Sequence, residues 1–295
     1  MILVDFSGCM HAAIAVDLNA NPGTKTDIAY LRKIIFEQIR SYHRKFSSKY
    51  GEMIICLDSN TGNWRKEIFP LYKYNRQKAR AESLIDWKAV FADVETIITE
   101  MREVFPFKVI RVPGLEADDV IAILAMNAEQ FTPKNLFDEM AYPVLIVSND
   151  KDFKQLHRFK HIKQYIPRSA NIIKEEDPEF YLINQILHGD ASDGVPNVKS
   201  PENIFTLYGQ RQSPVRSTFV KQFITEGEAC LTDFEKERYK MNKLLIDLTQ
   251  IPVKYYDLVF EEMKTIVPIN KFALMQYFAS KKLNSLIDKI DDFYR

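Results

Sequence analysis

The sequence has few cysteines, no long hydrophobic run and no net charge, and each lack limits what the chain can be. Its three cysteines, Cys9, Cys56 and Cys230, are widely spaced along 295 residues. They form no disulfide or metal-ligand pattern, which fits a reducing compartment. No apolar stretch approaches the roughly 18 residues of a membrane span, and no signal peptide opens the chain. We therefore expect a cytoplasmic protein without membrane segments.

The balance of 40 basic and 40 acidic residues argues at first against a nucleic-acid partner. Nine of the acidic residues, however, lie in short clusters that could surround a metal ion. Setting these nine aside leaves 31 acidic residues against 40 basic ones for the remaining surface. A polyanionic partner is therefore permitted.

Short apolar runs predict buried strands at four places, namely 2–5, 53–57, 108–112 and 144–147. Helical spacing of apolar residues predicts helices between them, at 27–46, 85–104 and 116–130. A polar, turn-rich stretch at 19–23 is expected before the first helix. Repeated alternation of strand and helix indicates an α/β fold, with a mostly parallel central sheet flanked by helices.

After residue 172 the pattern becomes helical, with helices predicted at 179–188, 232–248, 270–278 and 283–293. With 46% hydrophobic residues, the chain can bury one large core and a smaller one. We place a domain boundary near residue 180. Residues 1–180 would form the α/β core, and residues 181–295 a smaller all-α domain.

The nine clustered acidic residues follow or adjoin the predicted strands and helices; they are Asp5, Asp58, Glu116, Asp118, Asp119, Asp150, Asp152, Asp190 and Asp193. Because parallel strands bring their carboxyl ends to one edge of a sheet, we expect these side chains to gather there. Two like charges about 4 Å apart repel by roughly 4 kcal/mol at an effective dielectric near 20, so a cation is needed among them. Ligand sets made of oxygen favour Mg²⁺ or Mn²⁺. A metal pair held by carboxylates is a known solution for phosphodiester cleavage.

Each acidic cluster also has a plainer interpretation. Asp5 and Asp58 could cap the turn or helix that follows them, and Asp150 could cap a helix at 153–156. The acidic residues from 116 to 119 could complement a helix dipole, and Asp190 with Asp193 could form an Asx turn. Three carboxylates within four residues nevertheless exceed what one helix cap needs. The coincidence on consecutive strand ends favours the metal interpretation.

The segment from 59 to 80 mixes basic with aromatic residues and has no regular apolar period. A solvated helix face is the plainer interpretation of such a charge run. Beside the carboxylates, Arg65, Lys73 and Arg76 are natural phosphate ligands. Tyr72 could stack on an unpaired base. The segment is therefore a candidate nucleic-acid surface.

The ordered motifs VDFS, CLDSN, YKYNR, EADD, SNDKDF and GDASDG resemble the flap endonuclease family of structure-specific 5′ nucleases, in particular its ribonuclease H members from T-even-type bacteriophages. The likeness spans nearly the whole chain. It implies a PIN-like 5′ nuclease core, with a basic helical arch at about 60–104 and a duplex-binding role for residues 181–295. It also implies two Mg²⁺ ions, for which Mn²⁺ would substitute. The first would be held by Asp5, Asp58, Asp118 and Asp150 with Glu116 nearby, and the second by Asp152, Asp190 and Asp193, with Asp119 counted among the metal-associated residues.

The resemblance further implies a 5′→3′ exonuclease and flap endonuclease acting on 5′ ends of RNA/DNA and DNA duplexes, as in RNA primer removal during phage lagging-strand replication. Lys73 and Arg76 would act in catalysis by neutralising the scissile phosphate. Expected partners are branched or nicked DNA, RNA/DNA hybrids with a 5′ end, and a replicative single-stranded-DNA-binding protein at the C-terminal helices. The protein would be a monomer, in the host cytoplasm if phage-encoded.

One departure from the family pattern concerns the segment after GDASDG. Gly194 stands where Asn is usual, and the glycine-rich hairpin that commonly binds duplex phosphates is missing. We expect Lys199 to supply a phosphate contact instead.

Three alternative functions stay open at this point. One is a single-strand endoribonuclease of related fold, although such proteins are usually much shorter. Another is a catalytically silent nucleic-acid-binding scaffold, and the third is a small-molecule metal phosphohydrolase. The basic-aromatic segment argues against the third, because a small substrate does not need it.

Overall fold

The computed structural model describes residues 1–20, 26–131, 142–207, 209–267 and 269–294. Its centre is a sheet with the strand order β3-β2-β1-β4-β5-β6. The strands are β1 (Ile2–Asp5), β2 (Met53–Cys56), β3 (Lys108–Ile110), β4 (Val144–Val147), β5 (Ile162–Ile166) and β6 (Asn171–Ile173). The described pairs are parallel except for β5 with β6, which is antiparallel. The predicted mostly parallel sheet is confirmed.

Strands β5 and β6 were not predicted, and their composition explains why. β5 reads IKQYI and β6 reads NII, so neither shows the continuous apolar run of a central parallel strand. β6 lies at the edge of the sheet with Asn171 and Ile172 exposed. Edge strands bury little and leave a weak hydrophobic signal.

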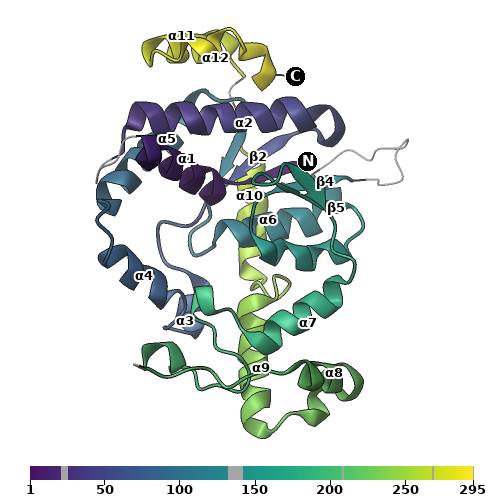
Figure 1. The fold of residues 1–295 in the computed structure, drawn as a ribbon. Helices are drawn as coiled ribbons and strands as arrows, with labels where there is room; N and C mark the ends of the chain where they lie inside the picture. Colours follow the sequence, from purple (N-terminus) through teal and green to yellow (C-terminus); the bar gives the residue numbers. More distant parts are fainter. Residues whose placement is uncertain (21–25, 132–141, 208, 268, 295) are drawn as a thin grey trace.

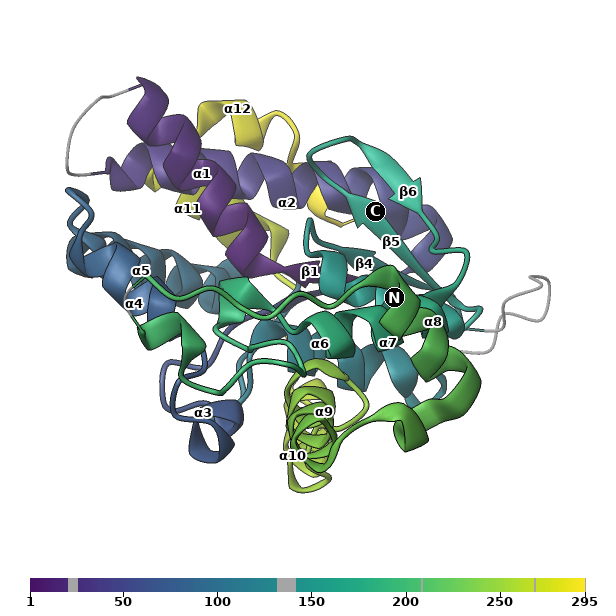
Figure 2. The ribbon, with the colours of Figure 1, turned by 60° about the horizontal axis from the view of Figure 1, so that its bottom comes forward.

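Both faces of the sheet are covered by helices, as Figures 1 and 2 show. Ile2 and Val4 of β1 face a cluster built with helices α1 (Phe6–Ala20), α2 (Ile28–Tyr50) and α5 (Trp87–Val104). Leu3, between them, faces the opposite cluster with α6 (Ala117–Met126) and α10 (Lys254–Met263). This alternation follows from the two-residue period of a strand.

Helix α1 was not predicted. The sequence favoured a strand followed by a turn-rich stretch at 19–23, and residues 21–23 of that stretch lie outside the described residues. In the structure the chain turns directly from Asp5 into α1. Its buried side is made partly of small residues such as Cys9 and Ala13, which pack against α2 but give a weak helical period.

The predicted arch segment, residues 60–104, contains two short helices and one long one. They are α3 (Trp64–Ile68), α4 (Tyr74–Ala81) and α5. Val90, Val94 and Ile97 of α5 are buried in the same cluster as α2 and the sheet. Helix α5 therefore belongs to the layer over the sheet, whereas Arg65, Lys73 and Arg76 lie on α3, in the turn after it and on α4.

The chain beyond residue 178 is mainly helical in its described parts, and besides α10 it packs at two further places. Helices α7 (Pro178–His188), α8 (Ser217–Glu226) and α9 (Asp233–Ile246) build a third cluster, which also contains Phe69 and Tyr72. Helices α11 (Lys271–Ser280) and α12 (Asn284–Ile287) return to cover α2 and α5 (Figure 1). Helices α8 and α10 were not predicted, whereas the helix near 283–293 is divided into α12 and a 3₁₀ turn at Ile290–Phe293. The division near residue 180 stays a prediction.

Among the described residues, no helix is long and apolar enough to cross a bilayer.

Substitution of Gly189, in the loop after α7, tests how tightly this loop packs against Val195. Gly189 has φ 67° and ψ −170°, and a Cβ there would clash with the Val195 carbonyl oxygen. Gly227 has a similar backbone, φ 63° and ψ −145°, with nothing within 4 Å of such a Cβ. Gly227→Ala should lower the free energy of unfolding by about 1–3 kcal/mol through backbone strain. Gly189→Ala should cost roughly 1–3 kcal/mol more because of the added clash.

Urea unfolding of the two variants provides the measurement, with Gly227→Ala as the matched control. Equal losses would show that the loop at Gly189 relaxes and that its approach to Val195 is not tight.

Candidate active site

The order of the strands decides where the acidic residues meet. β1 lies between β2 and β4, so the chain leaves β1 toward one side of the sheet and later returns on its other side. Ligand sites of open α/β sheets form at such a switch point, beyond the carboxyl ends of the strands. Asp5 ends β1, Asp58 follows β2, and Asp150 follows β4. These carboxylates therefore come from three adjacent strands.

One cavity at this edge brings together seven of the nine predicted carboxylates, namely Asp5, Asp58, Asp118, Asp150, Asp152, Asp190 and Asp193. Lys73, Arg76 and Lys151 line the same cavity, together with Ser7 and Ser192. Glu116 lines an adjoining cavity that shares Asp118, Asp152, Asp190 and Asp193.

Two hydroxyl groups that the sequence analysis missed hold the carboxylates at the strand ends. Ser148 Oγ donates to Asp5 Oδ2 at 2.8 Å, and Ser7 Oγ donates to Asp58 Oδ2 at 2.6 Å. The other oxygen of Asp58 accepts the Ala117 N–H at the start of α6, 2.8 Å away. The available signal was position, since Ser148 lies one residue after β4 and Ser7 two residues after Asp5.

The crowding of carboxylates changes their acidity. Burial raises the pKa of Asp5 to about 6, and repulsion from Asp58 and Asp150 adds to it. Burial also raises the pKa of Asp152 to about 7, again with repulsion from Asp150. The pKa of Asp118 lies well above its usual value for the same two reasons, burial first and repulsion from Asp150 second. Fully ionised, the cluster needs a cation.

The donor set fits a hard divalent cation, because the cavity offers many carboxylate oxygens. Among the described residues, no three carboxylate, histidine or cysteine side chains are grouped closely enough to hold an ion as they stand. Three acidic residues at these cavities are held in ion pairs. Asp193 is paired with Arg76, Glu116 with Lys73, and Lys151 lies 3.3 Å from Asp190. Closing a metal site would therefore require these side chains to turn.

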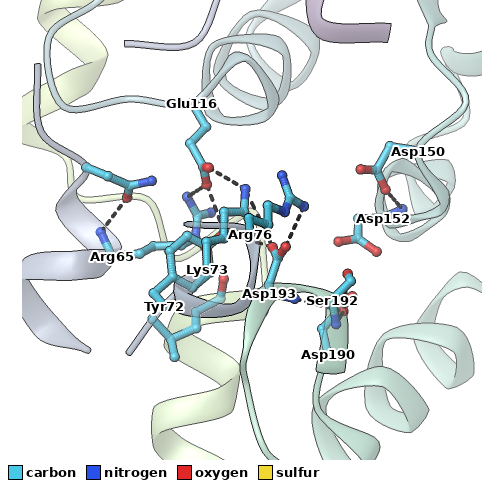
Figure 3. Close-up of polar contacts among 12 residues, drawn as sticks. Arg65, Tyr72, Lys73, Arg76, Glu116, Asp150, Asp152, Asp190, Ser192 and Asp193 are labelled. Atoms are coloured by element: carbon cyan, nitrogen blue, oxygen red, sulfur yellow. Dashed lines mark hydrogen bonds and ion pairs between the residues drawn. The ribbon is translucent and has the colours of Figure 1, made fainter. Parts of the chain in front are cut away.

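Lys73 and Arg76 form a clasp between two parts of the chain far apart in sequence (Figure 3). Lys73 Nζ pairs with Glu116 and lies 3.6 Å from Asp193 Oδ2. Arg76 Nη2 donates to Asp193 Oδ1 at 2.6 Å. The Lys73 backbone N–H also donates to the Asp193 carbonyl at 2.7 Å. Lys73 has φ 58°, an unfavourable conformation for a lysine that these contacts hold in place.

Two predicted nucleic-acid contacts are wrong. Arg65 is 2% exposed, and its guanidinium group binds Asp119, Glu116 and the Leu245 carbonyl rather than facing solvent. Tyr72 is 3% exposed, so its ring cannot stack on a base. Its hydroxyl oxygen lies 2.8 Å from Glu116 Oε2 and 3.0 Å from Asp193 Oδ2, and the two carboxylates share its single hydrogen (Figure 3). Arg65 and Tyr72 both contact Glu116, and Tyr72 also contacts Asp193, so they hold the two carboxylates that pair with Lys73 and Arg76.

The prediction that Asp119 is metal-associated is also wrong. The residue is fully buried and lines neither cavity. Its Oδ2 accepts Trp64 Nε1–H at 3.0 Å and the Glu116 N–H at 3.1 Å, and Arg65 lies against its other oxygen at 2.8 Å. Here the helix-cap interpretation is correct, because Glu116 and Asp119 form a capping box at the start of α6.

Glu116 stays ionised because its cations outweigh its burial. Burial alone would raise the pKa of Glu116, but Lys73 and Arg65 lower it to about 2. Glu116 is therefore available as a permanent negative charge opposite Lys73.

The segment after GDASDG uses its backbone N–H groups internally. Those of Asn197, Val198, Lys199 and Ser200 donate to Gln212 Oε1, the Leu187 carbonyl, Asn197 Oδ1 and the Asn197 carbonyl, respectively. They cannot serve as the phosphate-binding amides of a glycine-rich hairpin. Lys199 itself lies 3.0 Å from Glu235 and 3.8 Å from the centre of the Phe219 ring. Its phosphate contact stays a prediction.

Comparison with known proteins agrees with this geometry. The family model for the 5′-3′ exonuclease, N-terminal resolvase-like domain, matches residues 1–181, and that for the T4 RNase H C-terminal domain matches residues 176–293. The chain is 30% identical to the ribonuclease H of Enterobacteria phage T4, over 99% of this chain and 95% of that one. It is 25% identical to a 5′-3′ exonuclease of Aquifex aeolicus (strain VF5), over 94% and 90% of the two chains.

Two solved structures share the fold at low sequence identity. The T5 D15 protein co-crystallised with metal ions superposes with a TM-score of 0.59 at 16% identity, covering 89% of this chain and 96% of that one. The bacteriophage T5 flap endonuclease in complex with DNA and metal ions gives 0.58 at 15% identity, covering 90% and 99%. Because the family model matches residues 1–181 and the T4 ribonuclease H is 30% identical over nearly the whole chain, the chain belongs to the 5′-3′ exonuclease family, a family of phosphodiester-hydrolysing enzymes.

Proposed function

We propose that this protein is a Mg²⁺-dependent 5′→3′ exonuclease and flap endonuclease that hydrolyses phosphodiester bonds at the 5′ ends of RNA/DNA and DNA duplexes. The observation that carries this proposal is the pair Lys73 and Arg76, placed on the same cavity as seven carboxylates. The carboxylates suit hard divalent cations and the two basic residues suit a phosphate. A single cavity thus holds both the candidate metal ligands and the candidate phosphate-binding residues of a phosphodiesterase.

Two Mg²⁺ ions, with Mn²⁺ as a substitute, would be held by the cavity's carboxylates. The first would use Asp5, Asp58, Asp118 and Asp150 with Glu116 nearby, and the second Asp152, Asp190 and Asp193. When bound, the ions would supply activation of water and neutralisation of charge at the phosphate. The elevated pKa values of Asp5, Asp118 and Asp152 support a divalent partner, because added positive charge would offset the cost of burying these carboxylates and their repulsion.

The chain's own cations would act on the phosphate. Lys73 is held by Glu116 and Asp193, so its charge is positioned before substrate arrives. Arg76 is the more accessible of the two, with 47% of its side chain exposed, and it can turn from Asp193 to a phosphate oxygen. The buried Arg65 and Tyr72 would keep Glu116 and Asp193 in place during this exchange.

The biological role we propose is removal of RNA primers during phage lagging-strand replication. Support comes from the full-length match to a phage protein named ribonuclease H. The substrates would be branched or nicked DNA and RNA/DNA hybrids with a 5′ end. A replicative single-stranded-DNA-binding protein would contact the C-terminal helices of a monomer in the host cytoplasm.

Loss of one carboxylate should nearly abolish cleavage. Asp150 lines the cavity and repels both Asp5 and Asp118, so it lies among the charges that would bind the ions. In Asp150→Asn we expect the rate on a 5′-labelled flap duplex and on a 5′-RNA/DNA hybrid to fall by about 10²-fold or more. EDTA should abolish wild-type cleavage.

Asp257→Asn serves as the control, because Asp257 is exposed on α10. It should cut at the wild-type rate. Substrate binding without cleavage by the wild type in Mg²⁺ or Mn²⁺ would contradict the proposal and favour the scaffold function.

Removing the Lys73 charge should affect the chemical step more than binding. In Lys73→Ala the single-turnover rate should fall by about 10²–10³-fold, the usual cost of losing a group that stabilises transition-state charge. The dissociation constant of the substrate should change much less. Lys88→Ala, which removes an exposed lysine on α5, is the control and should retain both values. Equal losses of rate and affinity in Lys73→Ala would reduce Lys73 to a docking residue.

The raised pKa of Asp5 predicts how stability depends on pH in EDTA. A carboxyl group with a pKa of about 6 when folded, against 3.8 ordinarily, binds its proton more tightly in the folded state. Its stabilising contribution is complete below pH 3.8 and is lost as the pH rises through about 6. Asp5→Asn should therefore exceed the wild type in unfolding free energy by about 1–3 kcal/mol at pH 7.5.

The difference should close near pH 4, where Asp5 is largely protonated. Chemical unfolding at the two pH values, in EDTA, gives the measurement. A variant that is less stable than the wild type at pH 7.5 would show that Asp5 is not under electrostatic strain.

A further inference from the structure

A buried glutamine lies against one of the cavity's carboxylates. Gln185 belongs to α7, which packs against the 3₁₀ helix Lys151–Arg158 that carries Asp152. Gln185 is 7% exposed, and its Nε2 donates to Asp152 Oδ1 at 2.5 Å. Asp152 is also tied to Asp150, whose Oδ1 accepts the Asp152 N–H at 2.8 Å. One side chain from helix α7 thus reaches a candidate metal ligand in the segment that follows β4.

This amide does little for the stability of the fold. Gln185 Oε1 is buried and has no hydrogen-bond partner among the described residues. A buried acceptor without a donor costs about 1–3 kcal/mol, which offsets what the other end of the amide contributes. Gln155 is different: its Nε2 donates to the Ile246 carbonyl at 3.1 Å, and its Oε1 accepts the Leu248 N–H at 2.8 Å. Gln155 binds one backbone segment, at Ile246 and Leu248, through both ends of its amide, whereas Gln185 contacts a carboxylate.

The neutrality of this partner is informative. Asp190, Asp193 and Glu116 each have a lysine or arginine beside them. The described residues form no ion pair with Asp152, which has the Gln185 amide instead. A cationic partner would compete with a metal ion for the charge, and an apolar one would let the carboxylate rotate. An amide donor orients one oxygen and leaves the negative charge available.

We propose that Gln185 is a positioning residue for the second divalent cation, acting by fixing Asp152 from helix α7. This inference rests on the proposed metal-dependent nuclease function. It assigns a role in metal affinity to a residue outside the acidic motifs, and it makes that affinity depend on how α7 is docked against the α/β core.

Gln185→Met tests the proposal, because Met has nearly the shape of Gln and cannot donate a hydrogen bond. Mn²⁺ binding to the full chain is measured by the electron paramagnetic resonance signal of the free ion. We expect the affinity of one of the two bound ions to fall by about 10–100-fold. Thermal stability in EDTA should be unchanged or higher, since the unpaired Oε1 is removed with the amide.

Gln155→Met is the matched control, with the same chemical change at a second buried glutamine. It should lose stability, because the Ile246 carbonyl and the Leu248 N–H lose their partner, while the Mn²⁺ affinity of the folded protein stays at the wild-type value. In Gln185→Met, cleavage of the flap substrate should require about 10–100-fold more Mg²⁺ for half-maximal rate and recover at saturating Mg²⁺.

Unchanged Mn²⁺ affinity in Gln185→Met, with or without a loss of stability, would overturn the positioning role and leave the proposed function intact. A wild-type protein that binds no Mn²⁺ and shows no metal-dependent cleavage would overturn both. The two failures are therefore distinguishable.

Discussion

The gathering of seven carboxylates around one cavity is the constraint on which the rest of this structure depends. It arises because β1, β2 and β4 deliver Asp5, Asp58 and Asp150 to the same edge of the sheet. Burial first, and repulsion between neighbouring carboxylates second, raise the pKa values of Asp5 and Asp152. A protein can tolerate such a cluster where binding of a cation offsets the free energy lost by burying the carboxylates. The same residues that destabilise the empty site would therefore bind the ligand.

Two groups of basic residues pair with carboxylates, one lining the cavity and one buried. Lys73, Arg76 and Lys151 pair with carboxylates at the cavity. A phosphate can replace the carboxylates as partner of these basic residues, and a metal ion can replace the basic residues as partner of the carboxylates. Arg65 is buried beneath, held by Asp119 and by the Leu245 carbonyl at the end of α9. Removing one partner of a buried pair is costly, so Arg65 stays in place while the basic residues lining the cavity exchange partners. It also links the α/β core to the C-terminal helices.

Sequence patterns found the sheet and most of the acidic site because both are local signals. A buried parallel strand is a continuous apolar run, and Asp5, Asp58 and Asp150 stand at or just beyond the ends of such runs. The same reasoning failed for β5, β6 and α1, whose burial depends on neighbours rather than on their own period. It failed too for Asp119, since an acidic residue in a first helical turn looks the same whether it caps the helix or faces a metal.

By itself, the sequence determined the α/β class, the edge of the sheet where the carboxylates gather and the family to which the chain belongs. Tertiary structure alone decided which basic and aromatic side chains are exposed to solvent. Arg65 and Tyr72 carry the same chemical groups as their exposed neighbours, yet packing against α9 and α7 buries them, and their polar atoms then bind Asp119, Glu116 and Asp193. Burial is set by contacts distant in sequence, so composition cannot distinguish a ligand for phosphate from a support beneath it.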